Sequence, residues 1–330
     1  MGENAIDLTG ERILVENNEI TATGKAGILL TGGDRETLTS SENVVTNNLI
    51  HDWSQVYRTY QAAVSLDGVG AVCSHNEIYN SPHEAVTYSG NNHVIEYNVI
   101  HDVVQESSDA GAIYAGRSWS YYGNVIRYNC IYNIGSGTFA PSGIYFDDAL
   151  SGQQAYGNLL VNIPGSAFLL GGGRDLKIEN NLIVNAATPI AYDDRAMIGS
   201  SSSSWFRHSQ TPGEGLWATL SEVDIHSKAW QDAFPQLAEL SDDFENTDDP
   251  LFAANPANSS VKHNVVVNKK KEIGDISKGA EKYSDISENT LYKLSDSPFA
   301  ADGDYTLTQA PDGFEQLPFS QMGRTYTTVD

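Results

Sequence analysis

The chain has 330 residues, of which 43 are acidic and 19 are basic, so its formal net charge is −24. This charge disfavours nucleic acids and anionic membranes as partners, because both are negatively charged themselves. No apolar run approaches the length that spans a bilayer, and the sequence after Met1 is polar, without a signal peptide. We therefore expect neither a nucleic acid nor a membrane as partner.

The first elements along the chain are short repeats built around asparagine. An aliphatic or small residue is followed three positions later by asparagine and two positions later again by an aliphatic residue, as in Val15, Asn18 and Ile20. The repeats recur every 20 to 30 residues or so, which is typical of solenoids of stacked coils. The repeated asparagines are Asn18, Asn48, Asn76, Asn98, Asn129, Asn158, Asn181 and, after a long interruption, Asn264.

These repeats predict an all-β fold, a right-handed parallel β-helix in the form of a single-stranded solenoid. The apolar pieces have the length of strands, glycine and asparagine are frequent, and helical periodicity is absent within the repeats. We expect the asparagines to stack in one column and to bond turn backbone that no strand reaches, as a scaffold rather than a site. The interior beside them should be lined by Ile50, Ile78, Ile100, Ile131, Leu160 and Ile183.

A second strand follows each asparagine turn, and its residues alternate between inward and outward positions. Beyond the outward positions, small residues alternate with carboxylates such as Asp67, Asp147 and Asp193. This alternation predicts a groove along one face of the solenoid. The outward column in this register is Leu29, Ser65, Thr87, Tyr114, Tyr145, Leu169 and Ala191.

The chain divides into coils (residues 1–195), an insertion with short helices (196–258) and a last coil with a C-terminal cap (259–330), all within one domain. The insertion has apolar residues at helical spacing between Leu216 and Leu240. It would either wall the groove or cover apolar surface of the solenoid. We expect it to contact the solenoid through Trp217, Trp230 and Phe234, and we expect the cap to span Phe299 to Asp330.

The densest set of chemically active side chains surrounds Asp147 and Asp148. The repeat alignment places Arg117 beside Asp148 on the next coil, which predicts an ion pair between them. The pair is either a structural contact or part of a site. Aromatic residues nearby favour a site, because aromatic faces stack well on sugar rings, and the candidates for this contact are Tyr114, Trp119 and Tyr145.

A second cluster lies at the other end of the same strands. The alignment brings Tyr60 close to Pro82 and His83 close to Asp109, with Glu106 nearby. A lone histidine is usually structural, but titratable groups from three coils supply both proton donors and acceptors. We therefore interpret this cluster as part of the same site.

Several motifs of this chain are similar to those of carbohydrate-active right-handed β-helix proteins, and they resemble glycoside hydrolase family 141. The resemblance covers roughly residues 25–195, and it implies activity on plant cell-wall polysaccharides and a pair of catalytic aspartates. The matching positions here are Asp109 and either Asp147 or Asp148. The chain departs from that family in having less sequence before its first coil. The motifs are Arg58-Thr-Tyr60, Pro82-His83, Asp109-Ala-Gly-Ala-Ile-Tyr114, Gly116-Arg117, Phe146-Asp-Asp148 and Gly171-Gly-Gly-Arg-Asp175.

The residues favour hydrolysis of a plant or microbial polysaccharide by two aspartates, one protonating the leaving oxygen and the other activating water or attacking the sugar. Counted along extended strands, Asp109 lies too far from Asp147 for this chemistry unless the chain bends at Gly111. Asp147 and Asp193, two coils apart at about 10 Å, are an alternative pair.

Two alternatives come from other classes of protein. A polysaccharide lyase would need a neutraliser of a uronate, such as Arg117, Arg174 or Ca²⁺, and a base such as His83 or Tyr60. A non-catalytic carbohydrate-binding β-helix would keep the aromatic residues but would not need the carboxylates. Ultraviolet-absorbing products would identify a lyase.

We expect no cofactor and no dedicated metal site, with Ca²⁺ left open because Asp67, Asp147 and Asp193 could supply oxygen ligands. Zinc is disfavoured, since cysteine is scarce and the histidines fall on different turns. The expected partner is a polysaccharide or oligosaccharide. Such a substrate favours a secreted or cell-surface protein, and the oligomeric state stays open.

Overall fold

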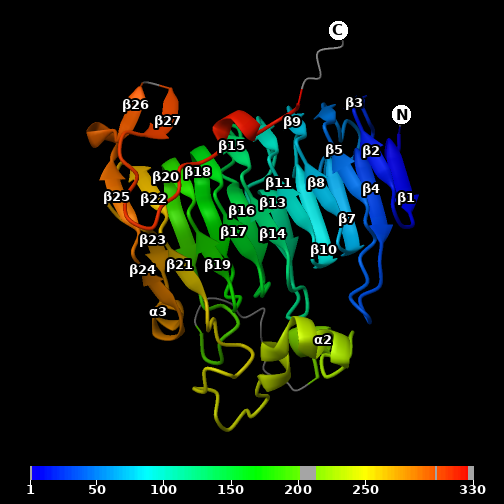
Figure 1. Cartoon of the computed structure of the whole chain (residues 1–330), viewed down its shortest axis with the longest axis vertical. Coiled ribbons are helices and arrows are strands. Elements are labelled where there is room, and N and C mark those ends of the chain that lie inside the picture. Colours follow the sequence, from blue (N-terminus) through cyan, green and yellow to red (C-terminus); the bar gives the residue numbers. More distant parts are fainter. Residues whose placement is uncertain (1, 201–212, 302, 326–330) are drawn as a thin grey trace.

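The computed structural model describes residues 2–200, 213–301 and 303–325 and shows a parallel β-helix (Figure 1). Strands of neighbouring coils pair in parallel and in register, which confirms the predicted all-β solenoid. The coils form three faces, which we name the site face, the back face and the tail face. A solenoid of this kind buries a continuous core between stacked units, so each coil depends on its neighbours.

The site face carries the longer strands, and β18 and β20 bend around a corner to end on it. Its strands are β1 (Ile6–Thr9), β4 (Ile28–Gly32), β7 (Val64–Val69), β10 (Val86–Asn91), β13 (Gly111–Gly116), β16 (Ser142–Asp147), the ends of β18 (Leu159–Leu170) and β20 (Leu182–Tyr192), and β23 (Gly274–Ile276).

The other two faces consist mostly of three-residue strands. The back face contains β2 (Leu14–Glu16), β5 (Val44–Thr46), β8 (Val72–Ser74), β11 (Val94–Glu96), β14 (Val125–Arg127), β17 (Gln154–Tyr156), β19 (Lys177–Glu179), β21 (Ser260–Lys262) and β24 (Asp285–Ser287). The tail face contains β3 (Glu19–Thr21), β6 (Leu49–His51), β9 (Glu77–Tyr79), β12 (Val99–His101), β15 (Cys130–Tyr132), the starts of β18 and β20, β22 (Val265–Asn268) and β25 (Thr290–Lys293).

The asparagine column is confirmed as a ladder at the corner between the back face and the tail face. The side-chain amide of Asn48 donates to Asn76 Oδ1 at 3.0 Å and to the carbonyls of Val15 and Thr46 at 2.9 Å. The backbone N–H of Asn48 also donates to Asn76 Oδ1, at 2.9 Å. Each amide thus satisfies backbone groups that the turn leaves without a strand partner. The ladder runs through Asn18, Asn48, Asn76, Asn98, Asn129, Asn158, Asn181, Asn264 and Asn289.

The predicted interior column is confirmed as well. The side chains after the ladder asparagines are fully buried in one continuous core that extends along the solenoid. Two coils follow the insertion rather than the single coil that we predicted, because Ile286, Asn289 and Leu291 repeat the same pattern and Asn289 continues the ladder.

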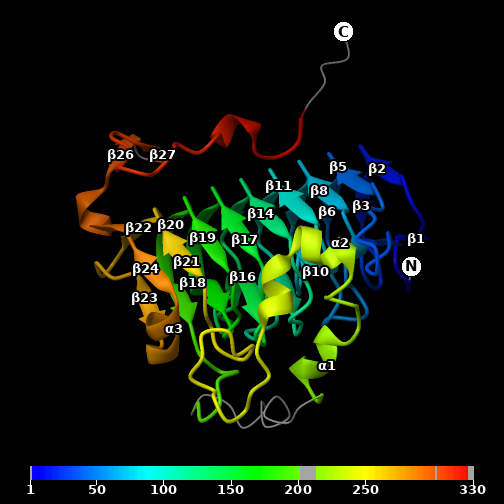
Figure 2. The same cartoon turned by 60° about the horizontal axis from the view of Figure 1, so that its bottom comes forward.

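The insertion packs below the ends of the site-face strands (Figures 1 and 2). Its described part contains α1 (Leu216–Leu220), α2 (Lys228–Ala233) and the 3₁₀ helix η2 (Pro235–Glu239), as predicted. Trp217 meets Trp119 of the solenoid edge to face at 4.9 Å, and Phe234 lies 5.6 Å from Tyr122. The fully buried Trp230 donates its indole N–H to the carbonyl of Arg35 at 2.9 Å.

The C-terminal segment is not the end cap that we predicted. After α3 (Lys278–Tyr283) and η3 (Leu294–Asp296), the hairpin of β26 (Phe299–Ala301) and β27 (Asp304–Leu307) leads into a strap that includes η4 (Phe319–Gln321). This strap runs back along the solenoid towards the N-terminal coils (Figures 1 and 2). The hydrophobic effect explains this course of the strap, because Leu307, Phe314 and Leu317 bury outward-facing aliphatic residues of β18, β20 and β22. None of the helices in the described residues is long and apolar enough to cross a membrane.

Candidate functional site

The site face brings Tyr114 and Tyr145 together as predicted. The two tyrosines pair across β13 and β16, with ring centroids 5.3 Å apart and ring planes at 84°. Gly116 pairs with Asp147 in the same register, so the carboxylates follow directly after the tyrosines. The predicted outward column is therefore the one that the structure shows, and neighbouring strands bring its side chains to a spacing of about 4.8 Å.

Asp147 and Asp148 end β16 in a buried cluster of charges. The predicted ion pair is present: Arg117 Nε lies 2.9 Å from Asp148 Oδ2. A second cation, Arg195, lies 2.9 Å from Asp147 and 3.1 Å from Asp148 through the same Nη1, and its Nη2 lies 2.7 Å from Asp193. One guanidinium thus connects three carboxylates. Sequence reasoning missed Arg195 because it follows the last regular strand before the insertion, where the repeat alignment ends.

The two neighbouring aspartates have different surroundings. Asp147 accepts hydrogen bonds from the Tyr114 hydroxyl at 2.9 Å, from the backbone N–H of Asp148 at 2.8 Å and from Arg195. Burial raises the pKa of Asp148, and the charge of Asp147 raises it further, while Arg195 and Arg117 lower it. Asp147 is therefore bonded by several donors, whereas Asp148 is pushed towards its protonated form.

The backbone at this cluster turns through the left-handed region. Arg117 has a φ of 71° and Asp148 a φ of 44°. Turns elsewhere along the solenoid use the same region, as at Asn47 and His75, so these angles belong to the coil geometry. The turns place the two residues of the ion pair directly after β13 and β16.

Asp109 reaches the cluster through Tyr145. The Tyr145 hydroxyl donates to Asp109 Oδ1 at 3.4 Å. Burial raises the pKa of the Tyr145 phenol, and the charge and hydrogen bonding of Asp147 raise it further. The Tyr145 phenol therefore bonds Asp109 while it lies in the electrostatic field of Asp147.

The separation of Asp109 and Asp147 along the strand stays a prediction. At Gly111 an added Cβ would lie 2.8 Å from the Tyr145 Cβ, so glycine leaves room there for Tyr145.

The second predicted cluster is also assembled. Arg58 and Glu106 form a bidentate ion pair, with Nε 3.0 Å from Oε2. Tyr60 is 85% exposed and its ring lies 5.5 Å from that of His83, which is only 2% exposed. The arrangement leaves Tyr60 as an accessible aromatic surface and His83 as the buried group beneath it.

Glu84 is a further carboxylate of this face that the sequence did not suggest. It is 5% exposed, its Oε2 lies 3.4 Å from His83 Nδ1, and its charge contributes to raising the pKa of Tyr114. Within the described residues the buried Nδ1 of His83 has no hydrogen-bond partner, although it faces the Glu84 carboxylate. Buried polar groups are normally satisfied, so this unsatisfied nitrogen in the neighbourhood of Tyr114 indicates a functional role. The position of Glu84 next to His83 was the one available sequence signal.

Two predicted binding residues are corrected by their burial. Trp119 is 1% exposed, because the insertion packs Trp217 onto it, so its ring cannot stack on a substrate. Arg174 is 4% exposed and is bound to Asp175 and to the carbonyl of Phe252. Both side chains hold the insertion to the solenoid.

The carboxylates of this face do not form a metal-binding group in the structure. Among the described residues, no three or more histidine, cysteine or acidic side chains are placed to hold an ion together. The guanidinium of Arg195 lies between Asp147, Asp148 and Asp193, in the place where the sequence left Ca²⁺ open.

Comparisons with known proteins agree with this architecture. Residues 2–183 match the family described as right handed beta helix region. The comparison with curated proteins found no match. A solved structure titled glycoside hydrolase is similar with 13% sequence identity and a TM-score of 0.41, over 69% of this chain and 37% of its own. The chain thus spans little more than a third of that structure, and a likeness of this size bears on neither substrate nor mechanism.

Proposed function

The chain belongs to the right-handed β-helix family, and from its site face we propose that it is a glycoside hydrolase acting on a polysaccharide. The observation that carries the proposal is the grouping of carboxylates around two tyrosines: the Tyr145 hydroxyl donates to Asp109, and the Tyr114 hydroxyl donates to Asp147, which adjoins Asp148. Two carboxyl groups on one face are the groups that glycoside hydrolases use.

The surroundings of the carboxylates suggest their roles. Asp148, whose pKa is raised by burial and by Asp147, would protonate the leaving oxygen. Asp109 is exposed and is paired with no cation in the described residues, so it would activate water or attack the sugar. Tyr114 and Arg195 bond Asp147 beside Asp148, and the charge of Asp147 is, after burial, a cause of the raised pKa of Asp148.

The accessible residues of the face suggest how the polymer lies. Tyr60 and Arg117 are exposed and lie at opposite ends of the site-face strands, before β7 and after β13, and Tyr114 lies within β13. A chain of sugars would therefore run across the site face along the strand direction, with its rings on the tyrosines and its hydroxyls on the charged groups. A polymeric substrate of this kind also favours a secreted or cell-surface location.

The cations of this face favour a hydrolase over a lyase. A lyase needs a cation that neutralises the uronate, but Arg117 and Arg195 are bound to Asp148 and Asp147, and Arg174 is buried. The excess of carboxylates would repel a uronate.

The test is an assay on a panel of plant and microbial polysaccharides that reads reducing ends and ultraviolet absorbance. Wild-type protein should release reducing ends without absorbance, and Asp109→Asn and Asp148→Asn should each lower kcat roughly 10²- to 10⁴-fold. Asp67→Asn is the matched control. In the strand register Asp67 takes the position of Asp147 on an earlier coil, but its carboxylate accepts a hydrogen bond from Ser89. Products that absorb would instead identify a lyase, and full activity in both variants would contradict the assigned site.

A further inference from the structure

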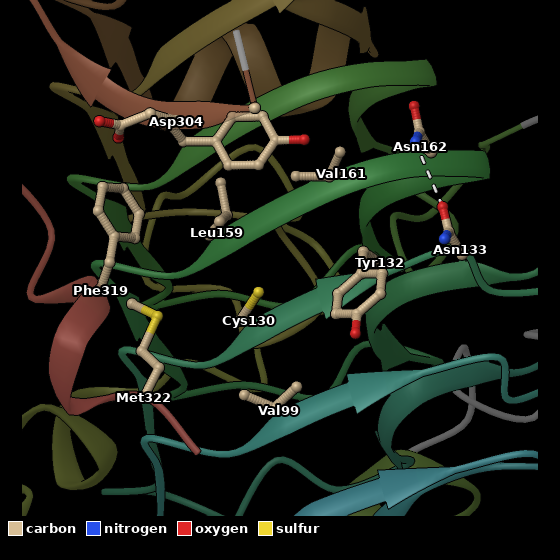
Figure 3. Close-up of a pocket in the computed structure, with 12 residues that line it drawn as sticks. Val99, Cys130, Tyr132, Asn133, Leu159, Val161, Asn162, Asp304, Phe319 and Met322 are labelled. Atoms are coloured by element: carbon tan, nitrogen blue, oxygen red, sulfur yellow. Dashed lines mark hydrogen bonds between the residues drawn. The ribbon is translucent and has the colours of Figure 1, made fainter. Parts of the chain in front are cut away.

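A cavity of about 540 Å³ lies on the tail face, between the solenoid and the C-terminal strap (Figure 3). Its floor is apolar and comes from three successive coils: Val99, Cys130, Leu159 and Val161. Phe319 and Met322 of the strap line it from the other side, together with Tyr305. This volume is in the range of small-molecule sites. The cavity is on a different face from Asp109, Asp147 and Asp148.

An aromatic stack on the tail face ends in this cavity. His51, Tyr79, His101 and Tyr132 lie one above another, with centroids 4.8 to 5.1 Å apart and planes within 11° of parallel. Each inner ring is therefore covered on both sides. Tyr132 has His101 on one side, and on its other side the register places Val161, a floor residue of the cavity. Tyr132 is only partly buried, so it meets the cavity with the part of its phenol that His101 and Val161 leave exposed.

Polar groups with unused hydrogen-bonding capacity surround this apolar floor. Asn162 donates to Asn133 Oδ1 at 3.3 Å, which leaves the amide N–H₂ of Asn133 available (Figure 3). Burial raises the pKa of the Tyr132 phenol, so the hydroxyl remains a donor at neutral pH. Asp304 accepts from the backbone N–H of Thr306 with one oxygen and has a second oxygen to offer. These groups are of the kind that bonds hydroxyls.

We propose that this cavity is a second, non-catalytic carbohydrate site, which holds one uncharged sugar ring between its apolar floor and the strap, beside the phenol of Tyr132. The apolar floor would contact the ring, and Asn133, the Tyr132 hydroxyl and Asp304 would bond its hydroxyls. The described lining contains one carboxylate and no lysine, arginine or histidine, so an anionic sugar is disfavoured. The proposal does not depend on the hydrolase activity of the site face.

Methionine methyl groups give a local readout that needs no activity. The chain has three methionines, Met1, Met197 and Met322, and only Met322 lines the cavity. We expect titration with methyl β-glucoside or methyl β-xyloside to shift the ¹³C-methyl NMR signal of Met322 saturably, without shifting that of Met197. The Met322 signal is assigned with Met322→Leu.

Two variants separate the site from general effects on the fold. Tyr132→Leu should weaken the titration of Met322 by roughly tenfold, since it removes from the cavity wall both the phenol ring edge and its hydroxyl donor. Tyr79→Leu is the matched control, because Tyr79 lies in the same stack with both faces covered, and it should leave the titration unchanged. The proposal is overturned if neither glycoside shifts Met322, if glucuronate shifts it equally, or if n-butanol does so as well, which would indicate a merely apolar cavity. Loss of hydrolysis with an intact Met322 titration would count against the proposed function alone.

Discussion

At the scale of residues, two buried carboxylates of the site face, Asp147 and Glu84, differ in the hydrogen bonds that they accept. Asp147 is bonded by a phenol, a backbone N–H and a guanidinium, whereas Glu84 is equally buried with no hydrogen bond in the described residues. A buried carboxylate without donors lowers stability. Its retention next to His83 and Tyr114 is best explained by function rather than by folding.

Replacement of Glu84 tests this explanation. Glu84→Gln removes a buried, unsatisfied charge at nearly equal size, so we expect Tm to stay the same or to rise. We expect kcat on the polysaccharide substrate to fall at the same time, because a group retained for function trades stability for activity. Thermal unfolding and the reducing-end assay measure the two effects. A lower Tm with unchanged kcat would show that Glu84 is a structural residue.

Asp148 makes a prediction about pH. Its folded-state pKa is raised above 3.8 by burial and then by Asp147, so protonated Asp148 contributes stability that is fully present below that value. This contribution is lost as the pH rises through the folded-state pKa. Asp148→Asn cannot ionise, so its Tm should decline less than the wild-type Tm over this window.

Thermal unfolding of both proteins in a pH series measures this difference. The slope of Tm against pH is the informative quantity, because Asp148→Asn also weakens the contacts to Arg117 and Arg195 at every pH. If Asp148 is also the proton donor, wild-type kcat should fall as the pH rises through the same pKa. Parallel Tm curves for the two proteins would contradict the raised pKa.

At the scale of elements, the asparagine turn and the strand after it were predictable because their rule is local. An asparagine two residues before an aliphatic residue fixes both the ladder and the interior column, as Asn48 and Ile50 show. The register of β13 and β16 followed from the same rule, so the ion pair of Arg117 and Asp148 could be predicted from sequence.

Other parts of the site depend on contacts that no local rule contains. Arg195 reaches Asp147 from the segment where the chain leaves the solenoid, and Trp119 is buried by an insertion about 100 residues later. The contact of Tyr145 with Asp109 depends on side-chain length rather than on strand spacing. Sequence therefore identified three aspartates of the site and one partner, Arg117, but neither Arg195 nor Glu84.

An interior isoleucine tests the element directly. Ile50→Ala should lower the free energy of unfolding by roughly 2 to 5 kcal/mol, because it leaves a cavity in a core where Ile50 is fully buried. Leu49→Ala is the control, since Leu49 precedes Ile50 in β6 and faces outward, half-buried, and it should cost roughly 1 kcal/mol or less. Denaturant unfolding measures both. Equal costs would mean that the two faces of β6 are equally packed.

At the scale of the whole molecule, the solenoid is covered on two sides by segments that do not belong to its coils. The insertion buries Trp119 and Tyr122 below the site face, and the strap buries apolar residues of β18, β20 and β22 on the tail face. The proposed catalytic and sugar-holding sites each lie beside one of these segments. The coils thus supply a rigid frame, and the two segments shape what the frame can bind.

The strap can be separated from the frame by experiment. Phe314 and Leu317 are each 6% exposed and pack on Leu182, Val265 and their neighbours. The double change Phe314→Ser with Leu317→Ser removes the apolar contacts that hold the strap, but it leaves the asparagine ladder and the interior column untouched. We therefore expect the strap to become sensitive to limited proteolysis while the far-ultraviolet circular dichroism of the β-helix is retained.

The same variant links the strap to the cavity. Because Phe319 and Met322 line the cavity from the strap, its release should abolish the saturable shift of the Met322 signal with methyl glycosides. Hydrolysis of soluble oligosaccharides should stay within about twofold of wild type, since Asp109, Asp147 and Asp148 lie on another face and make their contacts without the strap. Loss of the circular dichroism signal together with the strap would instead show that the strap is required for the solenoid to fold, since the outward faces of β18, β20 and β22 would then be too apolar to remain in water.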